Sequence, residues 1–327
     1  MAANSITVGT RKSPLAMAQA ELVVASLQAL FPSDSFPIRG TTTTGDRDQN
    51  TALYNFGGKG LWTTQLEDML TAGEVDIVVH SLKDMPTVLP DNCTLGAITT
   101  REDARDVLVI KKELRDKNKW QTIDQLPDGS VIGTSSIRRR AQLARRYPHL
   151  QFKTVRGNIQ TRLGKLESDQ ELVAIVLAAA GLLRMDLGEH ISQYLDFENG
   201  GMLHAVGQGA LGVECRAGDE RVLEALRKIE HHETTLACLA ERSLMRELEG
   251  GCSVPIGVET KWVEGKLSLR ATVVSVDGKE YVDVDFLEAL ATRQEADDLG
   301  RRAAKELVSK GADKILDAIN KARPEGK

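Results

Sequence analysis

The sequence predicts an α/β protein followed by a separate C-terminal α+β domain. Two strand-turn-helix units, at residues 5–32 and 131–148, have the layout of α/β folds, and continuous apolar strand segments accompany them. Beyond residue 218 the pattern changes to a long helix, a hairpin and a closing helix. At 327 residues the chain is longer than one hydrophobic core normally becomes, so two or three domains are expected.

The first unit begins with a short β-rich run and continues as a helix. Ser13 is suited to the N-cap and Pro14 to the first helical position, and apolar residues then follow at helical spacing. The second unit repeats this order, with a strand at 131–133, a turn and cap at 134–136, and a helix that ends before Pro148. Arginines lie beside both helix starts, where free amide groups attract anions, so we expect two anion sites.

Four further segments predict buried strands. Residues 75–81, 106–110 and 172–178 are apolar without alternation, which is typical of parallel sheets covered by helices on both faces. Glycines bracket the fourth segment, within residues 205–218. The first three segments therefore favour interior strands over half-exposed ones.

The C-terminal part follows a different order. Residues 231–249 predict a helix, 266–286 a hairpin that turns at Asp277-Gly278, and 293–321 one closing helix. Residues 45–63 fit no element, and the glycines around Lys59 indicate a lid. This stretch lacks the spacing of a phosphate-binding P-loop, which argues against a nucleotide site.

The charge is unevenly distributed along the chain. The net charge is −5, but residues 131–184 carry ten basic and three acidic side chains, which leaves −12 for the remainder. A basic interior segment in an acidic protein indicates a local anionic ligand more than a nucleic-acid surface. Within it, Arg140, Arg145 and Arg146 are expected on a solvated helix face.

The four cysteines lie far apart and form no C-x-x-C pair, so neither disulfides nor a metal site are expected. Cys252 differs from the other three because it follows two glycines and precedes a Ser-Val-Pro turn in a loop after a helix. Such a thiol is accessible as a nucleophile or as a covalent anchor. His80 and His204 are conceivable bases for it.

Residues 80–87, HSLKDMPT, follow an apolar strand and carry His80, Ser81, Lys83 and Asp84. Strand ends in covered parallel sheets are where α/β proteins place their sites. An adjacent Lys-Asp pair is more often a surface feature, so this motif alone is a weak indication.

Eight motifs follow one another in the order found in one family: VGTRKSPLA (8–16), GGKGLWT (57–63), DIVVHSLKDMPT (76–87), IGTSSIRRRAQL (132–143), VRGNIQTRLGKL (155–166), AAAGLLRM (178–185), VGQGALGVECR (206–216) and LEGGCSVPIG (248–257). The chain thus resembles the porphobilinogen deaminase family, also called hydroxymethylbilane synthases, nearly from end to end. It departs in Trp62, where many members have phenylalanine, and in Arg140, which extends an arginine pair to a triplet.

The resemblance implies the architecture. Two α/β domains like those of periplasmic binding proteins are expected, with domain 1 at residues 1–105 and 205–228 and domain 2 at 106–204. A smaller α+β domain 3, residues 229–327, would carry Cys252 toward the cleft between them.

The resemblance also implies the chemistry. Such an enzyme joins four porphobilinogen molecules head to tail, releases ammonia from each and yields the linear tetrapyrrole hydroxymethylbilane. Growth starts from a dipyrromethane cofactor that a thioether would tether to Cys252. Each pyrrole carries two carboxylates, and guanidinium groups match carboxylates with paired hydrogen bonds.

Roles follow for individual residues. Asp84 is expected to stabilise cationic pyrrole nitrogen and to help move protons. Lys59 and Trp62 would belong to the lid. Cofactor binding is expected from Cys252, Lys83, Asp84, Ser135, Arg138, Arg139, Arg162, Arg184, Gln208 and Gly209. Substrate binding is expected from Arg11, Ser13, Ser81, Arg156 and Arg162.

Two other functions stay open on the residues alone. A non-catalytic binding module for a small polycarboxylate would use the same sheets and arginines. Nucleic-acid binding through residues 131–184 is disfavoured, because Tyr147 and Phe152 are the only aromatic residues there. Without a signal peptide or a membrane-spanning run, we expect a cytoplasmic protein with no nucleic-acid or membrane partner; an organelle location after removal of a transit peptide stays open. The family resemblance alone implies a monomer.

Overall fold

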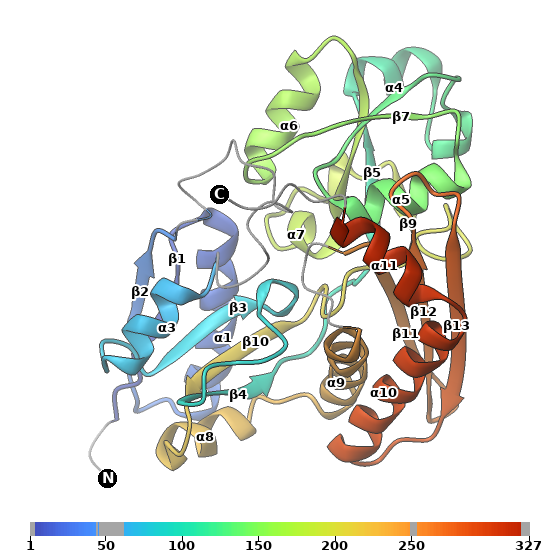
Figure 1. The fold of residues 1–327 in the computed structure, drawn as a ribbon. Coiled ribbons are helices and arrows are strands. Elements are labelled where there is room, and N and C mark those ends of the chain that lie inside the picture. The colour runs from blue at the N-terminus through green and yellow to red at the C-terminus, as the bar shows by residue number, and fades with distance from the viewer. Residues whose placement is uncertain (1–3, 44, 46–61, 249–253, 322–327) are drawn as a thin grey trace.

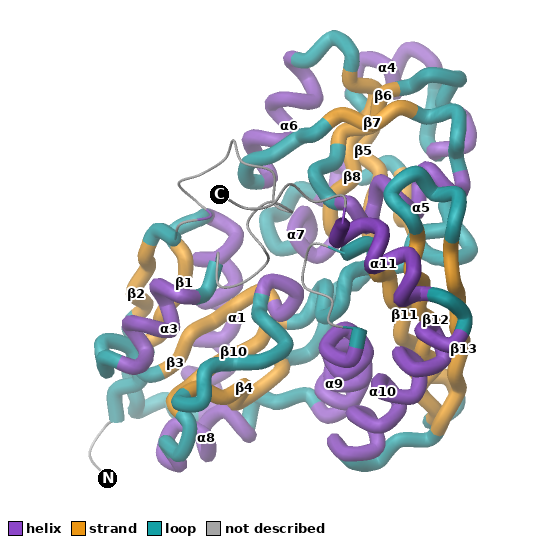
Figure 2. The backbone as a smooth tube through the Cα atoms, in the orientation of Figure 1, coloured by secondary structure: helices purple, strands orange, loops and turns teal. Residues whose placement is uncertain are grey.

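The computed structural model describes residues 4–43, 45, 62–248 and 254–321, and these residues form three sheets. Two are five-stranded sheets covered by helices, and the third is a smaller antiparallel sheet packed against helices of the C-terminal part (Figures 1 and 2). The predicted fold class, two α/β domains and a smaller α+β domain, is confirmed. No helix in the described part is long and apolar enough to cross a membrane.

The first sheet combines N-terminal strands with one strand from much later in the chain. In spatial order its strands are β2 (Ile38–Thr41), β1 (Val8–Arg11), β3 (Ile77–Ser81), β10 (Leu211–Arg216) and β4 (Cys93–Ile98). Its helices are α1 (Pro14–Leu30), α3 (Thr64–Thr71), η2 (Leu82–Asp84) and α8 (Glu220–Arg227). Helices α1 and α8 pack on one face through an apolar cluster that includes Val23 and Leu226, and α3 covers the other through Leu66 and Leu70.

The second sheet has the same design. In spatial order its strands are β7 (Gln151–Lys153), β6 (Val131–Gly133), β8 (Leu172–Ala178), β5 (Asp106–Ile110) and β9 (Gln193–Leu195). Its helices are α4 (Lys112–Asn118), η3 (Ile123–Gln125), α5 (Ile137–Arg146), α6 (Ile159–Ser168), α7 (Ala179–Leu183) and η4 (Gly188–His190). Helix α5 packs on one face through Leu143, and α6 and α7 cover the opposite face through Leu166 and Leu182.

The third sheet follows helix α9 (His232–Glu247). Its strands are β11 (Ile256–Val263), β12 (Lys266–Val274) and β13 (Tyr281–Glu288), all antiparallel to their neighbours. Helices α9, α10 (Arg293–Ser309) and α11 (Ala312–Lys321) bury one shared apolar core with it. Arg145 of α5 joins this unit to the second sheet, because it pairs with Asp283 at 2.7 Å and stacks on Tyr281.

Two expectations about the elements were wrong in part. The sheets are mixed, because β10 runs antiparallel to β3 and β4, and β5 runs antiparallel to β8 and β9. The expected single closing helix is two helices, α10 and α11, separated at Gly311, whose φ of 101° lies in the region that favours glycine. The remaining strand segments, the Ser13 cap and the hairpin were predicted correctly.

The chain crosses between the first and second sheets twice, at residues 99–105 and 196–210. The two crossing segments are hydrogen-bonded to each other, since Glu102 N donates to Gly209 O at 3.1 Å. At Gly209, with φ of 87°, a Cβ atom would come within 2.4 Å of Glu102 O, so the close approach of the two backbones requires glycine. These segments set how the two sheets face each other.

Candidate active site

A cavity of about 570 Å³ lies between the two larger sheets. Its walls come from the turns after β1, β3, β6, β7 and β8, so the carboxyl ends of strands from both sheets meet there. Every predicted site residue that the structure describes lines it: Arg11, Ser13, Trp62, Ser81, Lys83, Asp84, Ser135, Arg138, Arg139, Arg156, Arg162, Arg184, Gln208 and Gly209.

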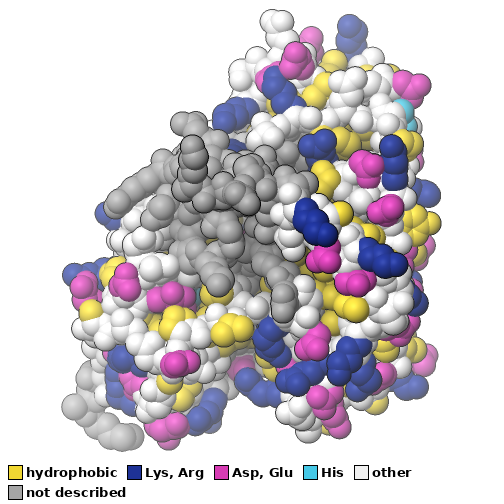
Figure 3. All heavy atoms as spheres, viewed as in Figure 1, with side chains coloured by type: hydrophobic (Ala, Val, Ile, Leu, Met, Phe, Trp, Pro, Cys, Tyr) yellow, Lys and Arg dark blue, Asp and Glu magenta, His cyan; other side chains and the backbone are white. Residues whose placement is uncertain are grey.

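The charge of the cavity wall is almost entirely of one sign. Eight of the described lining residues are basic and only Asp84 is acidic: Arg11, Lys12, Lys83, Arg138, Arg139, Arg156, Arg162 and Arg184 are the basic ones. The outer face shown in Figure 3 instead carries basic and acidic side chains interspersed. The described lining of the cavity thus carries an excess of positive charge, which favours a ligand with several negative groups.

The turn after β1 brings Arg11 and Ser13 to the cavity. Ser13 caps α1 by accepting a hydrogen bond from Ala16 N at 3.4 Å. The Arg11 guanidinium lies over the ring of Trp62, 4.0 Å from its centroid, which fixes an arginine and an aromatic side chain at the same edge. Lower on α1, Gln19 exchanges hydrogen bonds with Ser81 at 2.9 and 3.1 Å, linking this turn to the end of β3.

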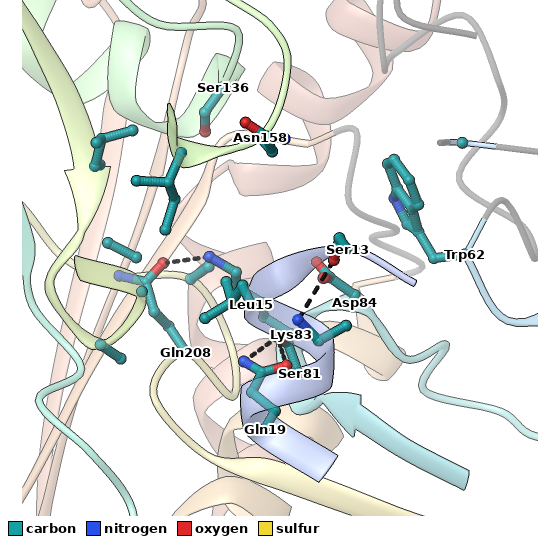
Figure 4. A pocket seen from close by; sticks show the side chains of 18 of the residues that line it. Ser13, Leu15, Gln19, Trp62, Ser81, Lys83, Asp84, Ser136, Asn158 and Gln208 are labelled. Carbon is teal, nitrogen blue, oxygen red and sulfur yellow. Dashed lines mark hydrogen bonds between the residues drawn. The ribbon is translucent and has the colours of Figure 1, made fainter. Parts of the chain in front are cut away.

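Strand β3 ends in the 3₁₀ turn η2, which presents Lys83 and Asp84 (Figure 4). Lys83 Nζ donates to Gln208 Oε1 at 3.3 Å. Burial lowers the pKa of Lys83 to about 8, with further lowering by Arg139 and opposition from the neighbouring Asp84. Figure 4 shows Asp84, Ser13 and Lys83 on one side of the cavity, with Ser136 and Asn158 on the other.

Helix α5 begins at the cavity with Ser136 as its N-cap, so Arg138 and Arg139 lie in its first turn. Both are buried against Asp106, the first residue of β5. Arg138 Nη1 donates to Asp106 Oδ2 at 2.7 Å, and Arg139 donates to Oδ1 from Nε and Nη2 at 3.1 and 2.8 Å. Burial would raise the pKa of Asp106, but the two guanidinium groups hold it well below its usual range.

Two more arginines reach the cavity from α6 and the end of α7. Arg162 Nε donates to Gly157 O at 2.7 Å, and burial, with the nearby Arg139 and Arg156, lowers its pKa to about 10. Arg184 Nη2 donates to Gly209 O at 2.7 Å, which ties α7 to a crossing segment, and burial lowers its pKa. With a pKa of about 10, Arg162 is cationic near neutral pH.

The C-terminal unit contributes Met245, Val254 and Ile256 to the cavity lining. Cys252 and Lys59, expected as the cofactor anchor and a lid residue, lie outside the described residues. His80 and His204, considered as bases, are not among the described residues that line the cavity. His80 is buried and hydrogen-bonded to Glu214 at 3.0 Å, and His204 lies beside Ala205 O at 3.0 Å.

Sequence reasoning missed several residues of the site. Lys12, Gln19, Ser136 and Asn158 line the cavity, and Asp106 lies directly behind two of its arginines. One signal for Asp106 was present, because an acidic residue that opens an apolar strand needs a cationic partner when it is buried.

Two family models match the chain, and together they cover most of it. The model described as "Porphobilinogen deaminase, dipyromethane cofactor binding domain" matches residues 6–224, and "Porphobilinogen deaminase, C-terminal domain" matches residues 235–309. The chain belongs to the porphobilinogen deaminase family. The first match includes every described site residue named above except those contributed by the C-terminal unit.

Curated porphobilinogen deaminases resemble the chain over nearly its whole length. The protein from Neurospora crassa is 52% identical over 325 residues, which is 98% of this chain and 96% of that protein. The one from Yarrowia lipolytica is 53% identical, covering 96% of this chain and 93% of that protein. The one from Synechococcus elongatus is 48% identical, covering 99% and 98%.

Solved structures of binding proteins are similar only weakly. Substrate binding domain 2 of Lactococcus lactis GlnP matches with a TM-score of 0.41 and 11% identity, over 69% of this chain and 88% of that one. A mutant of ArgBP from T. maritima matches with a TM-score of 0.36 and 14% identity, over 69% and 87%. Likeness at this level says nothing about ligands.

Proposed function

We propose that this chain is a hydroxymethylbilane synthase, the transferase that joins four porphobilinogen molecules head to tail with release of ammonia. The observation that carries the proposal is a cavity whose described lining has eight basic side chains and one carboxylate, Asp84. Family membership supplies the reaction, and the cavity supplies the charge pattern that the reaction requires. Porphobilinogen is therefore the proposed small-molecule substrate.

The described residues fit a dipyrromethane cofactor. Two linked pyrroles carry four carboxylates, which the basic wall can neutralise through charge-assisted hydrogen bonds. We assign this contact to Lys83, Ser135, Arg138, Arg139, Arg162 and Arg184, with Gln208 and Gly209 beside them. When bound, the group supplies a pyrrole primer for chain growth, and we assign its thioether to Cys252. Met245 and Val254, on either side of residues 249–253, line the same cavity, which supports that assignment.

Substrate binding is assigned to the part of the wall formed by Arg11, Ser13, Ser81, Arg156 and Arg162. Guanidinium groups stay protonated when several carboxylates enter, and they orient each one with two parallel hydrogen bonds. Trp62, which lies against Arg11, would shield this edge from water together with Lys59. Because the basic side chains come from both sheets, they can hold substrate between the two walls.

Asp84 is proposed as the catalytic residue. Loss of ammonia leaves positive charge on the substrate's pyrrole, and a fixed carboxylate stabilises that charge. At about 4 Å and an effective dielectric constant of about 20, the attraction amounts to about 4 kcal/mol, or about a thousandfold in rate when only the transition state feels it. Asp84 can also accept a pyrrole N–H and pass on the proton that is lost after coupling.

The domain limits are proposed as residues 1–105 with 205–228, 106–204 and 229–327. The crossing segments 99–105 and 196–210 support the limits between the first two domains. The start of α9 at His232 supports the limit of the third domain. A cytoplasmic monomer without nucleic-acid or membrane partners is proposed with them.

The test supplies porphobilinogen to the purified chain and measures ammonia and the linear tetrapyrrole by mass spectrometry. We expect four ammonia molecules for each tetrapyrrole released. Asp84→Asn keeps the shape and removes the charge, so turnover should fall by about a thousandfold. Binding of porphobilinogen without ammonia release by the unaltered chain would instead indicate a polycarboxylate-binding module.

A further inference from the structure

Asp106 lies behind the basic wall and takes part in neither of the roles assigned above. Its carboxylate is fully buried at the start of β5, where a crossing segment enters the second sheet. It accepts hydrogen bonds from Arg138 and Arg139, and a further one from Gln208 Nε2 at 2.9 Å. One carboxylate thus fixes two arginines of α5 and a residue of the other crossing segment.

Gln208 extends this contact to the first sheet. It is 1% exposed, and its Nε2 also donates to Ala104 O at 2.7 Å. Its Oε1 accepts the hydrogen bond from Lys83 Nζ at 3.3 Å (Figure 4). A continuous series of contacts therefore runs from Arg138 and Arg139 through Asp106 and Gln208 to Lys83, the neighbour of Asp84.

The charges of these residues determine how the contacts are arranged. Asp106 compensates one of the two guanidinium charges, so the wall stays cationic toward the cavity. A buried carboxylate is stable only while its partners stay in place, and the two guanidinium groups are likewise held by it. The Gln208 amide can serve Asp106 and Lys83 together only with its nitrogen toward the acid and its oxygen toward the ammonium.

We propose that Asp106 is a positioning residue that, through Gln208, keeps Lys83 charged and aligned beside Asp84 while it holds Arg138 and Arg139 in the opposite wall. The value of this arrangement for catalysis rests on the proposed function. The linkage between Asp106 and Lys83 is a property of the chain itself, and it can be measured without turnover.

Among the described residues, the charged groups that act most strongly on Lys83 are Asp84 and Asp106, which favour its ammonium form, and Arg138 and Arg139, which oppose it. Replacing Asp106 by asparagine removes one favourable charge and leaves both arginines. The pKa of Lys83 should then fall below its value of about 8.

The experiment measures the rate at which acetic anhydride labels Lys83 across a pH series, by peptide mass spectrometry of the full chain. In Asp106→Asn, we expect the pH at which Lys83 is labelled at half its maximal rate, its labelling midpoint, to fall by about one unit or more. Asp116→Asn is the matched control, because it removes the same charge from an exposed site on α4 that pairs with Lys112. In this control variant the labelling midpoint of Lys83 should equal that of the unaltered chain.

A folded Asp106→Asn variant with an unmoved Lys83 midpoint would overturn the proposal. Where that variant does not fold, Gln208→Met decides, since it keeps the bulk and removes the acceptor: a lowered midpoint supports the linkage and an unchanged one refutes it. The series is repeated in Cys252→Ser, in which no adduct can form on that thiol. Failure of the proposed function would show as absent bilane synthesis, whereas failure of this inference would show only in the Lys83 titration.

Discussion

The partly buried Arg101 and the fully buried Glu241 form an ion pair with two parallel hydrogen bonds, Nη1 to Oε1 at 2.6 Å and Nη2 to Oε2 at 3.0 Å. Arg101 lies in the first crossing segment and Glu241 in α9. Glu241 Oε2 also accepts from Gly207 N at 2.7 Å, so the same carboxylate holds both crossing segments. The C-terminal unit is thereby fixed to the region that sets how the two walls of the cavity face each other.

Glu241→Gln should therefore destabilise the whole chain. The amide keeps the volume but leaves the Arg101 charge without its counter-ion in a buried site, which costs about 3 kcal/mol or more. Urea denaturation of the variant and of Asp116→Asn, an exposed control, measures this. If the free energy of unfolding falls no more in Glu241→Gln than in the control, the pair does not fix the C-terminal unit.

Arg138→Ala is expected to lower both stability and ligand affinity. The substitution leaves Asp106 with fewer partners in a buried site, so the free energy of unfolding should fall by about 3 kcal/mol. Arg140→Ala, an exposed position of the same helix, should change it by less than about 0.5 kcal/mol. Denaturation and porphobilinogen titration of the two variants provide the comparison. Equal stability with weakened binding would assign Arg138 to ligand contact alone.

Deprotonation of Lys83 should lower kcat/KM at alkaline pH. Its pKa of about 8 means that the ammonium form, which binds carboxylates, is lost as pH rises through that value. In Lys83→Arg the cation persists, so the ratio of wild-type to variant kcat/KM should decline across that range. Lys279→Arg, an exposed change of the same kind, serves as control. A ratio independent of pH would contradict the charge assigned to Lys83.

His204 should make the fold sensitive to acid. Burial, reinforced by Arg101, lowers its pKa from 6.5 to about 4. Between these values the unfolded chain binds a proton that the folded chain does not, so acidification should remove up to about 3 kcal/mol of stability. His204→Gln should lose less than wild type between pH 7.5 and pH 4.5, while His149→Gln, at an exposed position, should follow wild type. If the free energy of unfolding falls equally with pH in wild type and in both variants, the role assigned to His204 is contradicted.

The sequence predicted the elements well where local rules decide them. Continuous apolar strands such as 106–110 and 172–178 have the expected bounds, and Ser13 caps α1 as expected. Strand direction could not be predicted, because β5 and β10 enter their sheets through long crossings that leave no local pattern. The break at Gly311 was missed because the apolar spacing continues on both sides of it.

For the candidate site, motifs placed side chains at strand ends, and fourteen of them line one cavity. The partners of these side chains depend on tertiary contacts. Arg139 was expected as a ligand clamp, and the structure adds a contact that the sequence did not predict, because its Nε and Nη2 donate to Asp106. Arg145 was expected on a solvated face and instead pairs with Asp283. Charge patterns therefore indicated where arginines gather without showing which of them are bound to protein.

The mass of the intact, freshly purified chain tests the central claim most directly. A basic cavity that holds a tethered dipyrromethane predicts an excess mass of two linked pyrroles, and it predicts that Cys252→Ser folds without that excess. Active wild-type protein that has only the mass of its polypeptide would contradict the account.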